Sequence, residues 1–289
     1  MYQIFVNGNQ PSFFEKQYAT HRVRAVRSFP ADSAKAITAF GFTSPAATGV
    51  IDEAAHTIAV TVPFGTTISA LVPMIFITGA SVSPASGAAH DFSSPVTYTV
   101  TAADASTQEY TVTVTVAAPV IGQSYGGGKV AYVLESVDPG YDENVWHGLI
   151  AATADQTPAN SGIIWALPAF QATLVPGGTG TEIGTGSANT TKIIAQNDVG
   201  VTYAAGLARA YTGGGYSDWY LPSKDELDKL YLNRDAIGGF RPPFYQSSSE
   251  HPADFTNRYW GQYFLVPGAG GQADSFKWNT YNVRAVRSF

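Results

Sequence analysis

Three stretches of this chain alternate between apolar residues and small polar or alanine residues, and this alternation limits what they can fold into. It runs through residues 57–62, 96–101 and 110–116, where threonine takes most of the polar positions. A period of two places successive side chains on opposite faces of a β-strand, so each stretch predicts a strand with one buried face. Turn sequences such as Pro63-Phe64-Gly65 separate the stretches. Residues 30–118 are therefore expected to form a small β-sandwich.

The composition narrows the class of protein to which these strands can belong. Only 13% of the 289 residues are charged, and that is about half the usual share. Such a composition, rich in glycine and proline, is typical of β-rich extracellular or virion proteins. The net charge of −6, without clusters of Lys and Arg, argues against nucleic acid as a partner. Cysteine is absent, which excludes disulfides, thiolate catalysis and cysteine-bound zinc.

The sequence shows no membrane or export signal. No apolar stretch approaches the roughly twenty residues of a transmembrane helix, so membrane insertion is not expected. Residues 1–10 lack the basic start and apolar core of a signal peptide. Three interpretations stay open: another export route, a chain that is part of a longer protein, or assembly inside the cell as in phage particles.

A seven-residue repeat is the strongest internal signal. Val23–Phe29 recurs without change as Val283–Phe289. The residues just before the two copies differ at almost every position; Tyr18, for example, stands opposite Trp278. Drift after a plain duplication would not spare seven residues while rewriting their neighbours. The pattern therefore indicates a constant segment preceded by one that is free to change.

Residues 119–289 are expected to combine strands and helices. The glycine turn and apolar residues of Gly126–Val133 predict a strand. Apolar residues at helical spacing predict one helix over about residues 190–210. A second helix is predicted to begin at Ser223, because Ser223 and Glu226 have the spacing of a capping box.

This C-terminal segment resembles a known protein family. The motifs that carry the resemblance are, in order, Gly126–Val133, the strand His147–Ile150, the stretch Gly215–Leu227, Ser247–Glu250 and the Val-Arg-Ala-Val-Arg ending. In these motifs it is similar to the C-terminal domain of the Legionella collagen-like adhesin and its bacterial and phage relatives. The resemblance implies a C-type-lectin-like fold. Residues 30–118 resemble, by pattern, the immunoglobulin-like modules of bacterial surface proteins.

These resemblances imply a β-rich, α+β chain with three parts. They are an orphan tail segment of a lectin-like domain (1–29), an immunoglobulin-like β-sandwich (30–118) and a C-type-lectin-like ligand-binding domain with two helices (119–289). Some relatives are variable proteins of diversity-generating retroelements, in which a constant ending follows a stretch rewritten by mutagenesis. The constant Val283–Phe289 and the changed residues before it are what such a system would leave.

The ligand site is expected on the segment that precedes the constant ending. A recognition face needs exposed aromatic side chains on a rigid support, beside polar side chains that can adapt their hydrogen bonds. The expected ligand-binding residues are Tyr259, Tyr263, Gln272, Asp274, Phe276, Trp278, Asn279, Thr280 and Tyr281, with the last six at the centre. The alternative, that aromatic residues fill the core, is favoured for Trp219, Trp260 and Phe264. Arg284 and Arg287 are expected to make structural contacts rather than to bind anions.

The motifs do not support enzymatic chemistry. The five histidines are scattered, acidic residues lack EF-hand spacing, and no phosphate-binding loop or Gly-x-Ser-x-Gly motif occurs. Formylglycine-generating enzymes share the fold that the resemblance implies, but they need cysteines. We therefore expect no catalytic residues, no metal and no cofactor, although the sequence leaves calcium binding open.

Four hypotheses for the function remain. The first is a receptor-binding protein of a phage tail that is diversified by a retroelement. The second is a bacterial surface adhesin that binds glycans or host matrix. A structural virion protein and a glycan-processing enzyme are the other two. The first two imply a cell-surface protein or glycan receptor as partner and a location on a virion or a cell surface, and they are compatible with a homotrimer.

Overall fold

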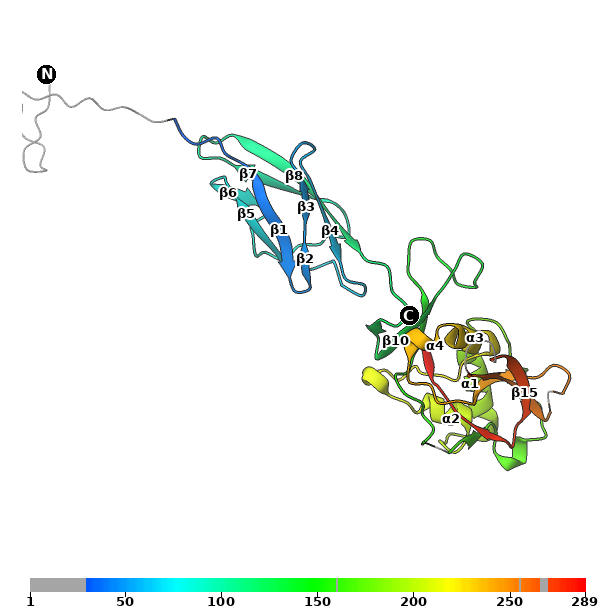
Figure 1. Cartoon of the computed structure of the whole chain (residues 1–289). Helices are drawn as coiled ribbons and strands as arrows, with labels where there is room; N and C mark the ends of the chain where they lie inside the picture. Colours follow the sequence, from blue (N-terminus) through cyan, green and yellow to red (C-terminus); the bar gives the residue numbers. More distant parts are fainter. Residues whose placement is uncertain (1–29, 160, 255, 266–269) are drawn as a thin grey trace, which may run out of the picture. The chain divides into compact units, whose positions relative to one another are not determined.

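The computed structural model describes residues 30–159, 161–254, 256–265 and 270–289, which form two compact units (Figure 1). The first unit contains the described residues up to Val62 together with Thr67–Thr115, and the second contains Pro63–Thr66 and Val116–Phe289. The orphan tail expected over residues 1–29, which includes the first copy of the repeat, lies outside the described residues.

The first unit is built from two sheets. One has the strand order β2-β1-β5, from β1 (Ile37–Thr43), β2 (Ala46–Thr48) and β5 (Pro73–Ile77). The other has the order β3-β4-β8-β7-β6, from β3 (Val50–Asp52), β4 (Thr57–Val62), β6 (Ser81–Ser83), β7 (Val96–Thr101) and β8 (Thr107–Val116). Side chains of β4 alternate between exposed and buried along its whole length. The strands predicted from the period of two are therefore confirmed.

Aromatic side chains hold the two sheets of this unit together. Phe40 of β1 and Tyr98 of β7 belong to different sheets, yet their ring centroids are 5.4 Å apart in an edge-to-face arrangement. Phe92 lies 5.4 Å from Phe42 in the same buried cluster. Edge-to-face pairs stabilise a core beyond the area that they bury. The unit is thus a β-sandwich, as the sequence predicts.

The described part of the second unit has three small sheets. The first has the order β17-β11-β10-β9, from β9 (Ser124–Tyr125), β10 (Gly128–Val133), β11 (Gly148–Ala151) and β17 (Val286–Ser288). The second pairs β12 (Ile163–Ile164) with β16 (Thr280–Tyr281). The third has the order β13-β14-β15, from β13 (Phe244–Glu250), β14 (Arg258–Tyr263) and β15 (Gln272–Phe276). The β-rich, α+β class expected for the chain is confirmed.

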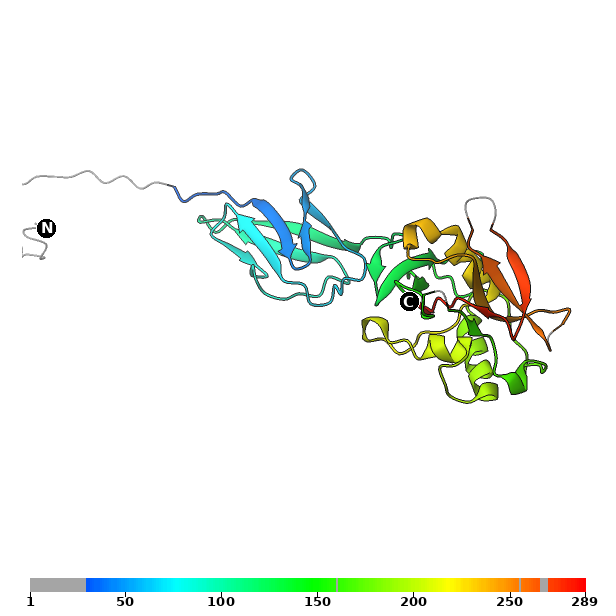
Figure 2. The ribbon, with the colours of Figure 1, turned by 60° about the horizontal axis from the view of Figure 1, so that its bottom comes forward.

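Of the two helices predicted for this unit, the first is divided and the second is confirmed. The first is divided into α1 (Gly186–Asn197) and α2 (Ala204–Arg209), and a single helix is excluded because Asp198 has a φ of 64°, outside the helical region. The second is α3 (Lys224–Leu232), and the short α4 (Arg234–Ile237) follows it. The capping box is confirmed, since the Ser223 and Glu226 side chains satisfy one another's backbone N–H groups. Helix α3 packs against β13 and β14 (Figure 2).

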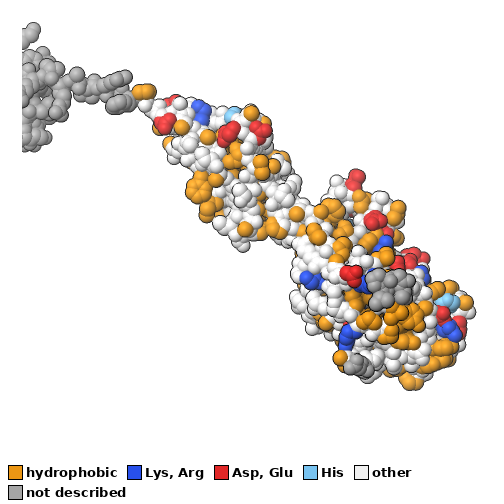
Figure 3. All heavy atoms as spheres, in the orientation of Figure 1, with side chains coloured by type: hydrophobic (Ala, Val, Ile, Leu, Met, Phe, Trp, Pro, Cys, Tyr) orange, Lys and Arg blue, Asp and Glu red, His pale blue; other side chains and the backbone are white. Residues whose placement is uncertain are grey.

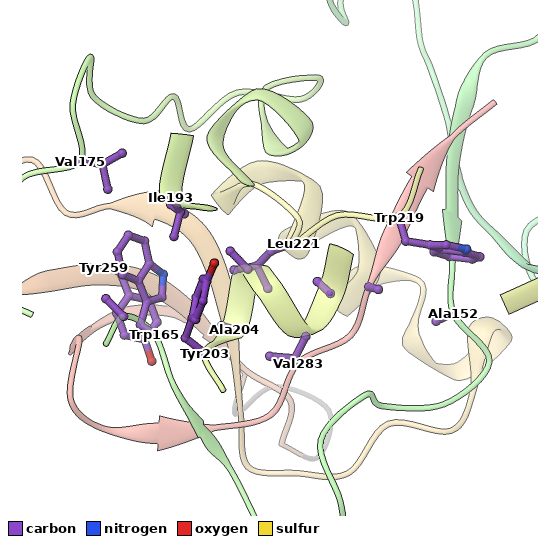
Figure 4. Packing of buried hydrophobic residues seen from close by; sticks show 14 of the residues in the cluster. Ala152, Trp165, Val175, Ile193, Tyr203, Ala204, Trp219, Leu221, Tyr259 and Val283 are labelled. Atoms are coloured by element: carbon purple, nitrogen blue, oxygen red, sulfur yellow. The ribbon is translucent and has the colours of Figure 1, made fainter. Parts of the chain in front are cut away.

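The core of the second unit lies between these helices and the sheets. Trp165 and Tyr259 are both fully buried and stack with ring centroids 5.6 Å apart (Figure 4). Ile193 and Leu221 belong to the same cluster, and Trp219 is fully buried within it, as predicted. No helix in the described part of the chain is both long and apolar enough to cross a membrane.

Candidate functional site

The β14–β15 hairpin presents one face that carries aromatic and charged side chains. Arg258 of β14 stands opposite Phe276 of β15, and Trp260 stands opposite Asp274. Directly opposed residues of an antiparallel pair project from the same side of the sheet, so these four side chains share a face. Together with Trp278, which follows β15, we call them the hairpin face.

Two aromatic rings of the hairpin face form a stack. Phe276 and Trp278 lie nearly parallel, with centroids 4.4 Å apart and an interplanar angle of 9°. Trp278 is 46% exposed, whereas tryptophan residues are on average highly buried. The guanidinium of Arg258 lies 4.0 Å from the centroid of Phe276 and so covers that ring. Phe276 therefore supports one face of the exposed Trp278 indole, and Arg258 in turn packs on Phe276.

The charges of the hairpin face are balanced. Arg258 forms an ion pair with Asp274, and both side chains are about one-third exposed. This hydrogen-bonded partner lowers the pKa of Asp274 from its ordinary value, so the carboxylate is ionised at neutral pH. Lys224 and His251 lie against the Trp260 ring, at 5.2 Å and 4.6 Å from its centroid. The face is polar at its edges and aromatic at its centre.

A groove of about 560 Å³ is lined by residues 161–162, 240–244 and 280–282. This volume falls within the roughly 300–1,000 Å³ of small-molecule sites. The ring centroids of Phe244 and Tyr281 are 4.6 Å apart, and Tyr263, which is 39% exposed, has its centroid 4.7 Å from that of Phe244. Among the described residues that line the groove, Arg241 carries the one formal charge.

The structure divides the predicted ligand-binding residues between these two surfaces. Asp274, Phe276 and Trp278 lie on the hairpin face, while Thr280 and Tyr281 line the groove. The remaining four lie elsewhere: Tyr263 packs beside the groove, Gln272 donates to the backbone oxygen of Lys224, Asn279 donates to Ser275 Oγ in the turn after β15, and Tyr259 is buried. The segment therefore supplies two sites rather than one continuous face.

Two assignments from the sequence are corrected. Tyr259 is fully buried and stacks on Trp165, so it supports the core and does not reach a ligand. Trp260 was expected in the core, but it is half-buried and projects from the opposite side of β14, onto the hairpin face. Adjacent strand residues point to opposite sides, so a core position for Tyr259 places Trp260 on the other face. Phe264 is buried, as expected.

The constant ending provides the support. Val283, Ala285 and Val286 are fully buried. Arg284 is also fully buried, and it bonds Asp155 and the backbone oxygens of residues 152, 238 and 239. Arg287 forms a two-bond ion pair with Asp218. The structural role expected for both arginines is confirmed.

Asp155 and Arg241 were missed in the sequence. Asp155 is fully buried, and its Oδ2 accepts hydrogen bonds from Arg241 Nε and from the Tyr245 hydroxyl, both at 2.8 Å. Its Oδ1 accepts from Arg284 Nε at 2.8 Å. The carboxylate is therefore shared by two guanidinium groups. No local motif in the sequence indicates this role of Asp155, because its partner Arg241 lies 86 residues away along the chain.

A buried ion pair lies beneath the hairpin face. Lys277 and Glu250 are both fully buried, with Nζ and Oε1 2.6 Å apart. Burial raises the pKa of Glu250 and lowers that of Lys277, and the bond between them opposes both shifts. The Glu250 oxygen also accepts the Val175 N–H. Lys277 thus anchors the end of β15, between Phe276 and Trp278 of the hairpin face.

The charged side chains of the described surface are dispersed. Within the described residues, no group of three or more His, Asp or Glu is placed to hold a metal ion. On the face that Figure 3 shows, Lys and Arg side chains are scattered, and several lie beside Asp or Glu side chains. A nucleic-acid site would need Lys and Arg clustered.

Residues 37–114 match a protein-family model described as SGBP, N-terminal. No curated protein matches the chain significantly. One similar structure is a candidate glycoside hydrolase from Bacteroides thetaiotaomicron, with 30% identity, a TM-score of 0.27, and 45% of this chain and 38% of that one covered. Another is a candidate secreted protein from Bacteroides fragilis, with 21% identity, a TM-score of 0.25, and 30% and 98% covered.

The chain thus covers less than two-fifths of the first structure's length. With TM-scores of 0.27 and 0.25, neither structure supports a conclusion about the fold or function of this chain. The resemblance of the second unit to the Legionella adhesin domain, and its C-type-lectin-like fold, stay predictions.

Proposed function

We propose that this protein is a surface-exposed glycan-binding adhesin whose second unit carries the ligand site. The observation that carries the proposal is the match of residues 37–114 to the N-terminal domain of SGBP, a family of glycan-binding proteins. A sandwich of this kind at the start of a binding protein would act as a spacer. The match favours the surface-adhesin hypothesis over a phage tail or a structural virion protein.

The surface of the second unit supports this role. The apolar side of a sugar ring packs on a flat aromatic ring, while its hydroxyls need hydrogen-bonding groups at the ring edge. The stacked Trp278 offers such a ring, and Asp274 and Arg258 lie on the same hairpin face. Tyr281 offers a second ring in the groove, next to Thr280. Rigid aromatic side chains give a large contact area at low entropic cost.

Binding without turnover is the second part of the proposal. Glycoside hydrolysis generally uses a pair of carboxylates that flank the bond to be broken. The described residues that line the groove include no Asp or Glu. The hairpin face has one carboxylate, Asp274, and that group is already bonded to Arg258. Neither surface therefore offers an acid and a base to one sugar.

The test is binding of the purified chain to bacterial cells and to an array of bacterial and host glycans. The variant Phe276→Ala/Trp278→Ala/Tyr281→Ala should lose binding, while Trp146→Ala should keep it. Trp146 is a matched control because it is 49% exposed, close to the value for Trp278, and lies in the loop before β11. Equal thermal stability must be shown first for all three proteins.

Four outcomes decide the proposal. Binding lost in the triple variant alone supports it. Equal binding by all three proteins would place the site elsewhere, and release of a sugar product would favour the glycan-processing enzyme. No binding by any protein would favour a structural role.

We further propose that the accessible positions before the constant ending vary between isolates, as in a retroelement variable protein. The observation that favours this is the unchanged Val283–Phe289 copy beside rewritten neighbours. The constant copy is the buried support, whereas Phe276, Trp278 and Thr280 are at least partly exposed. Sequences from several isolates test this, and substitutions spread evenly over residues 120–289 would contradict it.

A further inference from the structure

We infer that the groove beside Tyr281 seats an acidic sugar residue and that Arg241 binds its carboxylate. The inference rests on the proposed glycan-binding function and deepens it by naming the class of sugar. It starts from the lining of the groove, in which Arg241 is the one charged group among the described residues and no carboxylate faces it. A groove with this charge favours an anion over a neutral group.

Arg241 and its neighbour Arg284 carry more positive charge than the one carboxylate bonded to them can neutralise. Asp155 is the carboxylate bonded to Arg241, and it is bonded to Arg284 as well. Two guanidinium groups, which stay protonated in proteins, thus share one negative charge. Arg284 is fully buried, whereas the Arg241 side chain is 37% exposed. The unbalanced charge is therefore accessible at Arg241, in contrast to Arg258 on the hairpin face, which has Asp274 to itself.

The structure fixes Arg241 in place before any ligand arrives. Its backbone N–H donates to the Tyr245 hydroxyl, and its backbone oxygen accepts from Asn282 Nδ2 at 2.6 Å. In the side chain, Nε donates to Asp155 and Nη2 donates to the backbone oxygen of Thr157. A group held at four points loses little further freedom on binding, and this preorganisation favours affinity.

Donors on Arg241 remain for a ligand. A guanidinium has five N–H bonds, of which the described contacts use the one on Nε and one on Nη2. Three N–H bonds are left, including both on Nη1. A flat carboxylate can accept two of them at once, which is the geometry that makes Arg–carboxylate pairs strong. Tyr281 and Phe244 supply the aromatic wall for the sugar ring that carries the carboxylate.

The experiment uses the whole chain on an array of paired glycans, namely uronate oligosaccharides and the same oligosaccharides with every carboxyl group reduced to an alcohol. The wild type should bind the uronate member about 10- to 100-fold more tightly than its neutral pair, as a hydrogen-bonded charge would give. The preference should shrink as salt concentration rises. This comparison needs no substitution, so it does not depend on the folding of a variant.

The variant Arg241→Gln then locates the effect. It should remove the preference for uronates and still fold, because Asp155 keeps its bonds to Arg284. The control is Arg209→Gln, which removes the same charge from α2, outside the groove. Removal of the preference by Arg241→Gln alone supports the inference.

Three results would overturn it in distinguishable ways. Equal binding of both members by the wild type refutes the acidic-sugar inference and leaves the proposed function standing. A preference that persists in Arg241→Gln, with normal thermal stability, shows that another group binds the carboxylate. No binding of any glycan by the wild type refutes the proposed function and this inference with it.

Discussion

Asp155→Ala should be among the most destabilising single substitutions in the second unit. The Asp155 side chain is fully buried and bonds Arg284, Arg241 and the Tyr245 hydroxyl. Its removal leaves the guanidinium of Arg284, also fully buried, without its counter-charge. Loss of one partner of a buried ion pair costs about 3–5 kcal/mol in free energy of unfolding, because the remaining charge is still desolvated.

The matched control is Asp218→Ala, which breaks an ion pair of the same type at the surface. Asp218 is 55% exposed in its side chain and forms a two-bond pair with Arg287. An exposed pair contributes about 0.2–1 kcal/mol. The two variants remove the same group from partners three residues apart, and they differ mainly in burial.

Urea unfolding followed by tryptophan fluorescence measures the difference. All five tryptophans lie between residues 146 and 278, so the signal reports on the second unit alone. With an m-value of about 2 kcal/mol/M, the Asp155→Ala midpoint should fall by about 1.5–2.5 M and that of Asp218→Ala by less than about 0.5 M. A second variant, Asp155→Ala/Arg284→Met, should recover part of the loss because it removes the unpaired charge.

Similar midpoints for Asp155→Ala and Asp218→Ala would refute this reasoning. Arg284 also donates to three backbone oxygens, at residues 152, 238 and 239. Equal effects would mean that these carbonyls alone are enough to solvate the buried guanidinium. Asp155 would then contribute little to holding Arg241 in place.

Three other predictions concern the site and α3. Trp278→Ala should weaken glycan binding at least tenfold while the free energy of unfolding stays within about 0.5 kcal/mol of the wild-type value, since the indole is 46% exposed; calorimetry measures the first quantity and urea unfolding the second. Burial raises the pKa of Glu226, so its contribution to stability is full below the unfolded-state pKa and is lost as pH rises through the folded-state pKa. The advantage of the wild type over Glu226→Gln should therefore shrink from pH of about 4 towards neutrality, and a constant difference would contradict this. Ser223→Ala removes the capping hydroxyl and should lower stability by about 0.5–2 kcal/mol in the same fluorescence assay, with no change if the cap is dispensable.

Local patterns predicted several elements of the fold. The period of two in Thr57–Val62 predicted β4, because the side-chain alternation of a strand is set by its own backbone. The spacing of Ser223 and Glu226 predicted the start of α3 for the same reason. The division between α1 and α2 was missed: residues 198–203 are not helical, Asp198 has a positive φ and Tyr203 is extended. Val199-Gly200-Val201 has low helix propensity and was the signal for this break.

The candidate site was predictable in composition but not in geometry. The sequence indicated that Phe276, Trp278 and Tyr281 would be accessible, yet it placed Tyr259 with them. A hydrophobic pattern normally shows which face of a strand is buried, but Tyr259 and Trp260 are adjacent aromatic residues on opposite faces of β14, so the pattern does not decide between them. Arg241 becomes a site residue through Asp155, whose position the fold alone determines.

Lys277 shows how a changing surface can keep a fixed support. It lies between Phe276 and Trp278 on the segment that we propose to vary, but unlike them it is fully buried and paired with Glu250. Gln17 stands opposite it in the other copy of the segment, so the position does differ between copies. Replacing Lys277 would leave the Glu250 carboxylate without this ion pair, and a carboxyl in that state gains a proton rather than stay charged. Substitutions at Phe276 and Trp278 carry no such penalty, because their outer surfaces face solvent or ligand. A substitution at Lys277, such as the Gln of the other copy, is therefore expected to cost stability that substitutions at Phe276 and Trp278 do not, although the three residues are consecutive on one segment.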